Sequence, residues 1–370
     1  MYDLPILIAI IIFSVVVVIH ELGHFFAARK CGVYVEEFAV GLGPKLLSRK
    51  GKTGTLYSLR AFPIGGFCKM RGQEGGVDDP ESFSSKKVSQ RIFIIMAGII
   101  LNVVLALVIS FIIVSFNSFT APTVHTVSEN SPAATAGLQS GDRITRVNGK
   151  AVRIFADIPW HLEGTAGKRI PVEIRRGGEK ITVQVIPVKT DGTERLGFWP
   201  GAKTALFAPS IDGFDRAGLF ETAGTAFYQT AFYVRATFVG VGRLVTNRLA
   251  LSEFSGIVGF TGIIGDVYDD SVAGADELRD AGKDAPSNTS IAFWLTMQFI
   301  VILSANLGVM NLLPIPPLDG GRLVFLLIEA VRKKPINPER EGMIHLVGFV
   351  LLMILAAVIT YNDILQRLPR

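Results

Sequence analysis

The sequence HELGH at residues 20–24 follows directly on an apolar stretch that is long enough to enter a lipid bilayer. Residues 4–19 are dominated by Leu, Ile and Val, and no charged residue separates them from the motif. At about 1.5 Å per residue of helix, His20 lies roughly 24 Å from Leu4, within a hydrocarbon core of about 30 Å. Ionisable side chains at this depth are costly and are usually functional. The motif therefore predicts a polar site inside a membrane helix.

The spacing of the motif is suited to binding a metal ion. His20 and His24 are four residues apart, so both imidazoles lie on one face of a helix and can bind one Zn²⁺. Glu21 is turned aside by about 100° and can accept a proton from metal-bound water. A solvated helix can carry this motif by chance, but its position in a membrane helix favours the catalytic interpretation.

Composition indicates a multi-pass membrane protein. The 370 residues are 49% hydrophobic and only 19% charged, which argues against a soluble enzyme. The net charge of +5 does not indicate nucleic-acid binding, because the basic residues cluster beside apolar segments as topology signals do. The only cysteines are Cys31 and Cys68, so no disulfide framework is expected.

Hydropathy predicts an α-helical polytopic protein with about four transmembrane helices in the cell (cytoplasmic or inner) membrane. The predicted spans cover about residues 4–28, 92–116, 299–330 and 343–360. Basic residues in the loop 29–91, and in the loop after the third span, predict that both loops are cytoplasmic. Residues 117–294 are then extracytoplasmic, and the zinc site lies in the membrane toward the cytoplasmic side.

A fifth apolar stretch, residues 218–245, has helical periodicity but is interrupted by charged residues. We interpret it as an amphipathic helix lying against the membrane or the protein core; the alternative of a further embedded segment stays open. Residues 266–288 are polar and contain Ala-Gly pairs, which predicts a flexible connector.

Residues 121–189 predict a small β-rich α+β domain inserted between the second and third spans. The run GLQSGDRITRVNG at 137–149 ends in an Asn-Gly hairpin signal, and residues 172–174 and 181–186 alternate around a Gly-Gly turn. This pattern resembles a PDZ domain, a class that commonly binds extended peptide ends by strand addition. A generic small β-rich domain is the alternative.

The segment NLLPIPPLDGG at residues 311–321 offers a third zinc ligand, Asp319. Its prolines cannot continue a regular helix, so they free backbone amides and carbonyls at membrane depth. Such backbone is tolerated there only where protein or a wet cavity surrounds it. Asp319 could instead pair with Arg322, but together with the first-helix motif the metal-ligand interpretation is favoured.

Together, the HExxH motif, the PDZ-like insertion and the NxxPxPxLDG motif resemble the site-2 protease family of intramembrane zinc metalloproteases, in its bacterial RseP-type branch with a single PDZ domain. The resemblance implies that His20, His24 and Asp319 bind zinc and that Glu21 is the catalytic base. It further implies that Asn311 holds the substrate backbone. The implied substrates are single-span membrane proteins, such as anti-sigma factors already trimmed outside the cell or remnant signal peptides.

Substrate access raises a separate problem, because a transmembrane helix hides its carbonyls until it unwinds. Residues 57–62 and 67–71, joined by 63–66, predict a β-hairpin whose edge could pair with the unwound segment. Leu59, in the first strand of this hairpin, and Pro316, in the proline cluster, are expected to contact the substrate. The PDZ domain is expected to screen the extracytoplasmic end of the substrate.

The expected organisation has four parts: residues 1–116, 121–189, 213–290 and 291–370. One competing interpretation is a non-catalytic membrane adaptor with a structural zinc site, but such sites normally have four protein ligands and only three are found. A metal transporter would need ionisable residues along several helices, but the second span offers only Asn102 and the fourth little beyond His345. The sequence therefore predicts an intramembrane zinc metalloendopeptidase.

Overall fold

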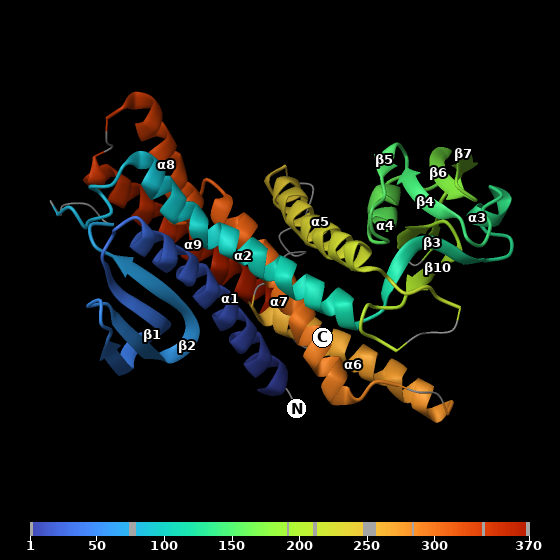
Figure 1. Ribbon diagram of the computed structural model, residues 1–370, viewed down its shortest axis with the longest axis horizontal. Helices are drawn as coiled ribbons and strands as arrows, with labels where there is room; N and C mark the ends of the chain where they lie inside the picture. Colours follow the sequence, from blue (N-terminus) through green and yellow to red (C-terminus); the bar gives the residue numbers. More distant parts are fainter. Residues whose placement is uncertain are drawn as a thin grey trace. The chain divides into compact units, whose positions relative to one another are not determined.

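The computed structural model describes residues 3–73, 79–190, 192–209, 213–246, 257–282, 285–334 and 337–367. The chain forms two compact units, which are described separately (Figure 1). The first unit consists of Met1–Ile109 and Tyr233–Arg370, and the second of Ser110–Phe232.

Four helices of the described residues are long and apolar enough to cross a membrane. They are α1 (Asp3–Lys30), α2 (Val88–Phe116), α7 (Asn288–Leu312) and α9 (Pro338–Arg367). None of the most apolar part of α9 is buried by protein, as expected for a helix that faces lipid. The prediction of a polytopic protein with about four spans is confirmed.

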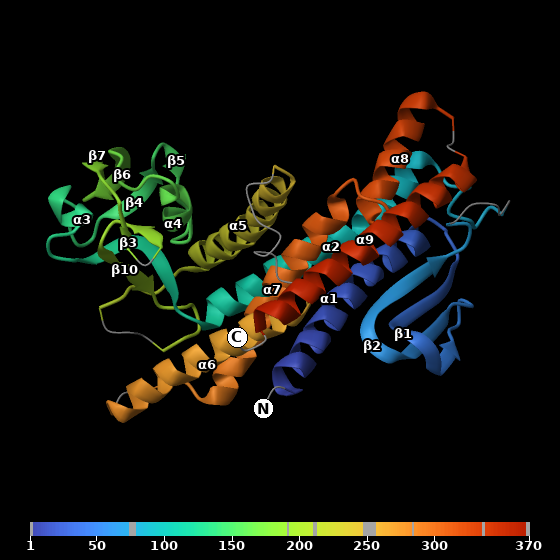
Figure 2. The same ribbon diagram turned by 180° about the vertical axis from the view of Figure 1, so that it is seen from behind.

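Helices α1 and α2 lie side by side in both views of the ribbon (Figures 1 and 2) and pack with their backbones in close contact. A Cβ atom added to Gly23 of α1 would lie only 2.4 Å from the carbonyl oxygen of Ala97 in α2. Small residues allow this close approach between membrane helices. Farther along α1, Ile12 and Val16 are buried in a cluster with Phe299 and Ile300 of α7.

The loop between α1 and α2 forms a sheet, but its pairing differs from the predicted hairpin. Strands β1 (Val35–Lys50) and β2 (Leu56–Met70) pair with each other, so residues 57–62 and 67–70 belong to one long strand. Both ends of β2 pair with the first part of β1: residues 66–70 with 35–40, and residues 56–59 with 37–40. Residues 56–60 pair in addition with residues 45–50. The turn therefore lies at residues 51–55. Long-range pairing with β1 decides this register, and local turn residues do not reveal it.

Two further segments differ from expectation. The third predicted span is divided: α7 ends at Leu312, and a separate helix α8 (Asp319–Arg332) begins after the prolines, because proline cannot continue the hydrogen-bond ladder of α7. The predicted flexible connector from residue 266 contains the greater part of a helix, α6 (Ile257–Asp280). Ala, Leu and Glu favour helix there, and the helix buries Ile264 and Ala275. Tertiary packing of this kind overrides the weak preference of interior glycines for other conformations.

The second unit contains the predicted β-rich domain. Its sheet has the order β10-β3-β4-β6-β7, with β5 paired to β4. Its elements are β3 (Phe119–Val127), α3 (Pro132–Thr135), β4 (Arg143–Val147), β5 (Lys150–Ala151), α4 (Asp157–Leu162), β6 (Ile170–Arg176), β7 (Glu179–Val185), β8 (Val188–Thr190), β9 (Thr193–Arg195) and β10 (Phe198–Lys203). Alternating residues such as Ile144, Val172 and Ile174 form its core. Because β10 pairs with β3, the sheet extends beyond the expected boundary at residue 189.

Helix α5 (Leu219–Val245) follows this domain. Thr222, Ala226 and Thr230 are spaced four residues apart and are buried, whereas Phe220 and Phe227 are exposed. This distribution is that of an amphipathic helix. The helix is not among the described helices that are long and apolar enough to span a membrane.

A buried ion pair stabilises the domain of the second unit. Asp142 is fully buried and accepts two hydrogen bonds of 2.7 Å from Arg176, and one of 2.8 Å from the Gln139 backbone N–H. Burial acts to raise the pKa of Asp142, but these hydrogen bonds outweigh it and hold the pKa below its ordinary value. The stabilisation is therefore complete above the ordinary pKa near 3.8 and is lost as the pH falls through the lowered value.

We expect Asp142→Asn to lower the free energy of unfolding of this domain by about 2 kcal/mol at neutral pH and to flatten its acid dependence. Denaturant unfolding of the full-length protein, followed by fluorescence of Trp160 and Trp199, measures both effects. The control Glu173→Gln removes an exposed pair with Arg146 and should change stability by less than about 1 kcal/mol. Equal effects of the two variants would contradict the assigned role of the buried pair.

Candidate active site

Three side chains from two helices converge inside the first unit. His20 and His24 lie on α1 and are buried, and Asp319 is the first residue of α8. The Oδ2 atom of Asp319 lies 3.0 Å from His20 Nε2 and 3.1 Å from His24 Nε2. The two Nε2 atoms lie 3.1 Å apart. Within the described part of the chain, these residues form the group of ligand atoms able to hold a metal ion.

This triangle of donor atoms fits zinc. Two ligands at about 2.1 Å from a tetrahedral ion lie roughly 3.4 Å apart, close to the separations found here. Nitrogen and carboxylate oxygen are ligands that zinc accepts, and three protein ligands leave one position open. The other ring nitrogen of His24, Nδ1, lies 2.9 Å from the carbonyl oxygen of Ile94. Donation of its N–H to that carbonyl leaves the Nε2 lone pair free for a metal.

Asn102 of α2 provides the corresponding contact for His20. Its Oδ1 atom is buried without a hydrogen-bond partner among the described residues, and its Nδ2 atom lies 3.4 Å from His20 Nδ1. The oxygen and nitrogen of a side-chain amide are assigned from their hydrogen bonds. With the oxygen turned toward His20, the Nδ1–H of His20 donates to the amide oxygen and Nε2 is free for a metal. The amide nitrogen then takes the position in which the oxygen has no partner.

We expect Asn102→Leu to weaken zinc binding by about 10- to 100-fold, because the ring orientation and tautomer of His20 are no longer held. Competition between the purified protein and a chromophoric zinc chelator measures the affinity. Asn117→Leu, one residue beyond the end of the same helix, is the matched control and should bind zinc like the wild type. Unchanged affinity of the Asn102 variant would show that this contact does not tune the site.

Close backbone packing positions both halves of the site. A Cβ atom on Gly98 of α2 would lie 2.6 Å from His24 Nε2, so only glycine lets α2 approach the imidazoles. A Cβ atom on Gly320 would lie 2.1 Å from the carbonyl oxygen of Leu313, which fixes the start of α8 against the end of α7. At the other end of α8, Glu329 accepts a 2.5 Å hydrogen bond from Arg91 of α2 in a largely buried ion pair.

Glu21 faces a cavity of about 390 Å³ beside the three donor atoms. The cavity is lined by Glu21, His24, Phe67, Cys68, Lys69, Met70, Gln73, Ile95, Pro317, Asp319 and Arg322. The backbone N–H of Cys68 donates to Glu21 Oε2 at 2.9 Å. The end of β2 therefore turns a backbone N–H toward the carboxylate, and the cavity leaves space for a ligand beside it.

The three residues that the sequence predicts to contact substrate lie at different distances from the zinc ligands. Asn311 Nδ2 lies 3.2 Å from His20 Nε2, at the site. Pro317 lines the cavity and Pro316 precedes it, joined by a cis peptide bond. Leu59 lies on β2 but does not line the cavity, and the hairpin on which its role was predicted is not formed.

Other residues at the site were not predicted as members of it. Asn102 could have been found, because it is a polar residue within an almost wholly apolar span. The contacts of Cys68 and Ile94 involve backbone atoms, which leave no signal in the sequence.

A membrane helix bearing HExxH, with a carboxylate from a second segment beside it, defines the class of membrane-embedded metallopeptidases. The comparisons agree with this class: the model of peptidase family M50 matches residues 8–355. The chain belongs to this family, the site-2 protease family, and is a zinc metalloendopeptidase.

Several curated proteins are similar over nearly their whole length. A Clostridium acetobutylicum protein that carries the name of a zinc metalloprotease is 35% identical over 359 residues, covering 97% of each chain. The zinc metalloprotease RasP of Geobacillus kaustophilus is 29% identical over 440 residues, covering 96% of each chain. The regulator of sigma-W protease RasP of Bacillus subtilis is 30% identical over 444 residues, covering 97% of each chain.

Among solved structures, the PDZ domain of an SdrC-like protein from Listeria monocytogenes is similar to part of the chain. It aligns with 22% of this chain and 88% of its own, at 20% identity and a TM-score of 0.20.

Proposed function

We propose that this protein cleaves peptide bonds within or near the transmembrane segments of single-span membrane proteins, with zinc held by His20, His24 and Asp319. The observation that carries the proposal is the convergence of three donor atoms, 3.0–3.1 Å apart, beside a cavity that Glu21 also lines. Three protein ligands leave the fourth coordination position of zinc open, and Glu21 lies beside the ligands without being one of them.

The side chains divide the chemistry between them. When bound, zinc supplies an activated water and Lewis acidity at the scissile carbonyl. Glu21 is the general base: its carboxylate accepts a proton during attack and then passes it to the leaving amine nitrogen. In this proposal Asn311 donates a hydrogen bond to the substrate backbone, and its Nδ2 atom, 3.2 Å from His20 Nε2, supports that role.

The substrate must be extended when it reaches this site, because a helix keeps its carbonyls bonded internally. The end of β2 from Phe67 to Met70 lines the cavity, and the Cys68 N–H already points at Glu21. An unwound segment can add to this strand and recover lost backbone hydrogen bonds. We therefore place substrate pairing at Phe67–Met70 and not at Leu59.

Charge supports an orientation with the site toward the cytoplasm. Arg29 and Lys30 end α1, Arg91 begins α2, and the Arg91–Glu329 pair holds that end of α2 against the end of α8. Basic residues thus gather at one end of the first unit, the end expected to face the cytoplasm. His20 lies about 15 Å of helix from Lys30. The PDZ-like domain, inserted between the second and third spans, is then extracytoplasmic and screens or binds the outer end of the substrate.

We propose membrane-anchored anti-sigma factors trimmed outside the cell, or remnant signal peptides, as the substrate class. The name of the Bacillus subtilis relative, a regulator of sigma-W protease, supports a role of this kind. A second function, a non-catalytic adaptor with a structural zinc site, is less well supported. A structural site would be closed by a fourth protein ligand, and the described residues offer three beside an open cavity.

The test uses the purified full-length protein in detergent with a single-span model substrate whose helix is weakened by glycines. We expect about one zinc per chain by elemental analysis, cleavage that stops on chelation, and cleavage that returns with zinc. Mass spectrometry of the products should place the cut inside or near the span. Zinc-loaded protein that cleaves none of several such substrates would favour the adaptor.

A further inference from the structure

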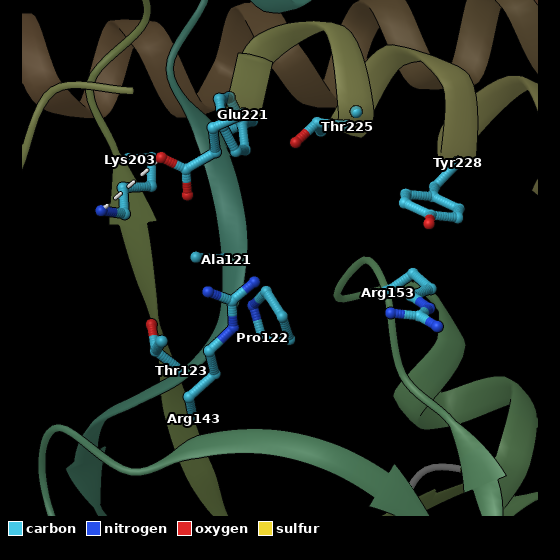
Figure 3. Close-up of a pocket in the computed structure, with 11 residues that line it drawn as sticks. Ala121, Pro122, Thr123, Arg143, Arg153, Lys203, Glu221, Thr225 and Tyr228 are labelled. Carbon is cyan, nitrogen blue, oxygen red and sulfur yellow. Dashed lines mark ion pairs between the residues drawn. The ribbon is translucent and has the colours of Figure 1, made fainter. Parts of the chain in front are cut away.

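A cavity in the second unit, which shares no lining residue with the peptidase cavity, is lined by three cationic side chains (Figure 3). It has a volume of about 180 Å³ and lies between the sheet of the small domain and the first turns of α5. One wall comes from β3 and another from α5. They consist of Phe119, Ala121, Pro122 and Thr123, and of Glu221, Gly224, Thr225 and Tyr228. The guanidinium of Arg143 points into the space between these walls and Arg153 lies opposite Tyr228, whereas Lys203 lies at the edge beside Glu221 (Figure 3).

The positive charge of this cavity is only partly neutralised. Lys203 Nζ lies 3.9 Å from Glu221 and 3.4 Å from Asp215, whose side chain is 90% exposed. The guanidinium of Arg153 lies 5.5 Å from the ring centre of Tyr228, a cation–π contact. Within the described part of the chain, the side chains of Arg143 and Arg153 have no carboxylate partner. Two guanidinium groups therefore remain available to an anion.

The end of a membrane span lies close to the cavity. The span α2 ends at Phe116, and Phe119 already lines the cavity. The Phe207 backbone N–H donates to Ser115 at 2.9 Å, and its ring lies 5.2 Å from that of Phe116. Phe207 is 62% exposed and Phe220, directly before Glu221, is 92% exposed. Exposed apolar rings beside the end of a span can be buried at the boundary between the lipid headgroups and the acyl chains.

We propose that this cavity binds the phosphate of an anionic phospholipid headgroup in the outer leaflet. Arginine is the preferred partner of phosphate because its planar guanidinium can donate two parallel hydrogen bonds. The cavity is smaller than the roughly 300–1,000 Å³ of sites that enclose a whole ligand, so it suits a headgroup. The exposed rings of Phe207 and Phe220 provide the apolar surface that the acyl chains of such a lipid require.

The test measures binding of short-chain lipids to the zinc-loaded, full-length protein by native mass spectrometry in detergent. The probes are dioctanoyl phosphatidylglycerol, dioctanoyl phosphatidylcholine and glycerol 3-phosphate. We expect the wild type to prefer phosphatidylglycerol. Arg143→Gln and Arg153→Gln should each weaken its binding by about fivefold, and the double variant by about 25-fold. The control Arg175→Gln, an exposed arginine of β6 outside the cavity, should leave it unchanged.

Each remaining outcome is decisive. Equal binding of the two lipids, or equal effects of the Arg175 and Arg143 variants, would overturn the proposal. Glycerol 3-phosphate binding as tightly as phosphatidylglycerol would retain the phosphate chemistry but overturn the lipid as its source. Displacement of the lipid by a peptide with a free carboxyl end, and not by its amide, would assign the cavity to peptide ends instead.

Discussion

Glu21→Gln is expected to reduce cleavage of a single-span substrate by about 10²- to 10⁴-fold while leaving zinc bound. The amide nearly matches the carboxylate in size but cannot accept the proton from the attacking water. It can still accept the hydrogen bond that the Cys68 N–H donates to Glu21, so the end of β2 should stay in place. Initial cleavage rates and zinc content measured on the same preparation separate catalysis from metal loss.

The matched control is Glu339→Gln, which removes an exposed carboxylate from the first turn of α9. It should cleave at the wild-type rate. If the Glu21 variant retained wild-type cleavage, the general base would have to be another group, and the proposed mechanism would be wrong even though zinc was bound. This outcome would leave the proposed lipid site untouched, because that site shares no residue with the peptidase cavity.

Asp319→Asn is expected to weaken zinc binding by more than about 100-fold and to abolish cleavage. Loss of an outer partner alone typically costs 10- to 100-fold, and Asp319 is proposed to bind the ion directly. The variant also removes the negative charge that lies 3.0 Å and 3.1 Å from the two imidazole nitrogens. Chelator competition measures the affinity, and cleavage in excess zinc measures the residual activity.

Asp270→Asn, an exposed carboxylate of α6, serves as the control and should leave both quantities unchanged. Full zinc affinity in the Asp319 variant would remove this residue from the ligand set. Zinc would then be held by the two histidines and by a third ligand other than Asp319. A circular dichroism spectrum like that of the wild type excludes unfolding as the cause of any loss.

Local patterns were sufficient for much of this fold. Long apolar runs predicted the four spans, because a helix must satisfy its own backbone in lipid. Alternation at Val172 and Ile174 predicted buried strands of the small domain, because every second residue of a strand faces its core. Features that depend on tertiary contacts did not follow from such patterns. The pairing of β2 with β1 was not predicted, and residues 266–280, predicted as a connector, belong to α6.

The sequence by itself determined which chemistry was available: His20, Glu21 and His24 share one helix, and the spacing of a helix places two imidazoles on one face. Only the tertiary structure decided what surrounds them. It brought Asp319 within 3.1 Å across nearly 300 residues of chain, turned Asn102 toward His20 and the Cys68 amide toward Glu21. The reason is physical: residues on one helix are related by a fixed repeat, whereas partners from different segments depend on how backbones pack, here through Gly98 and Gly320.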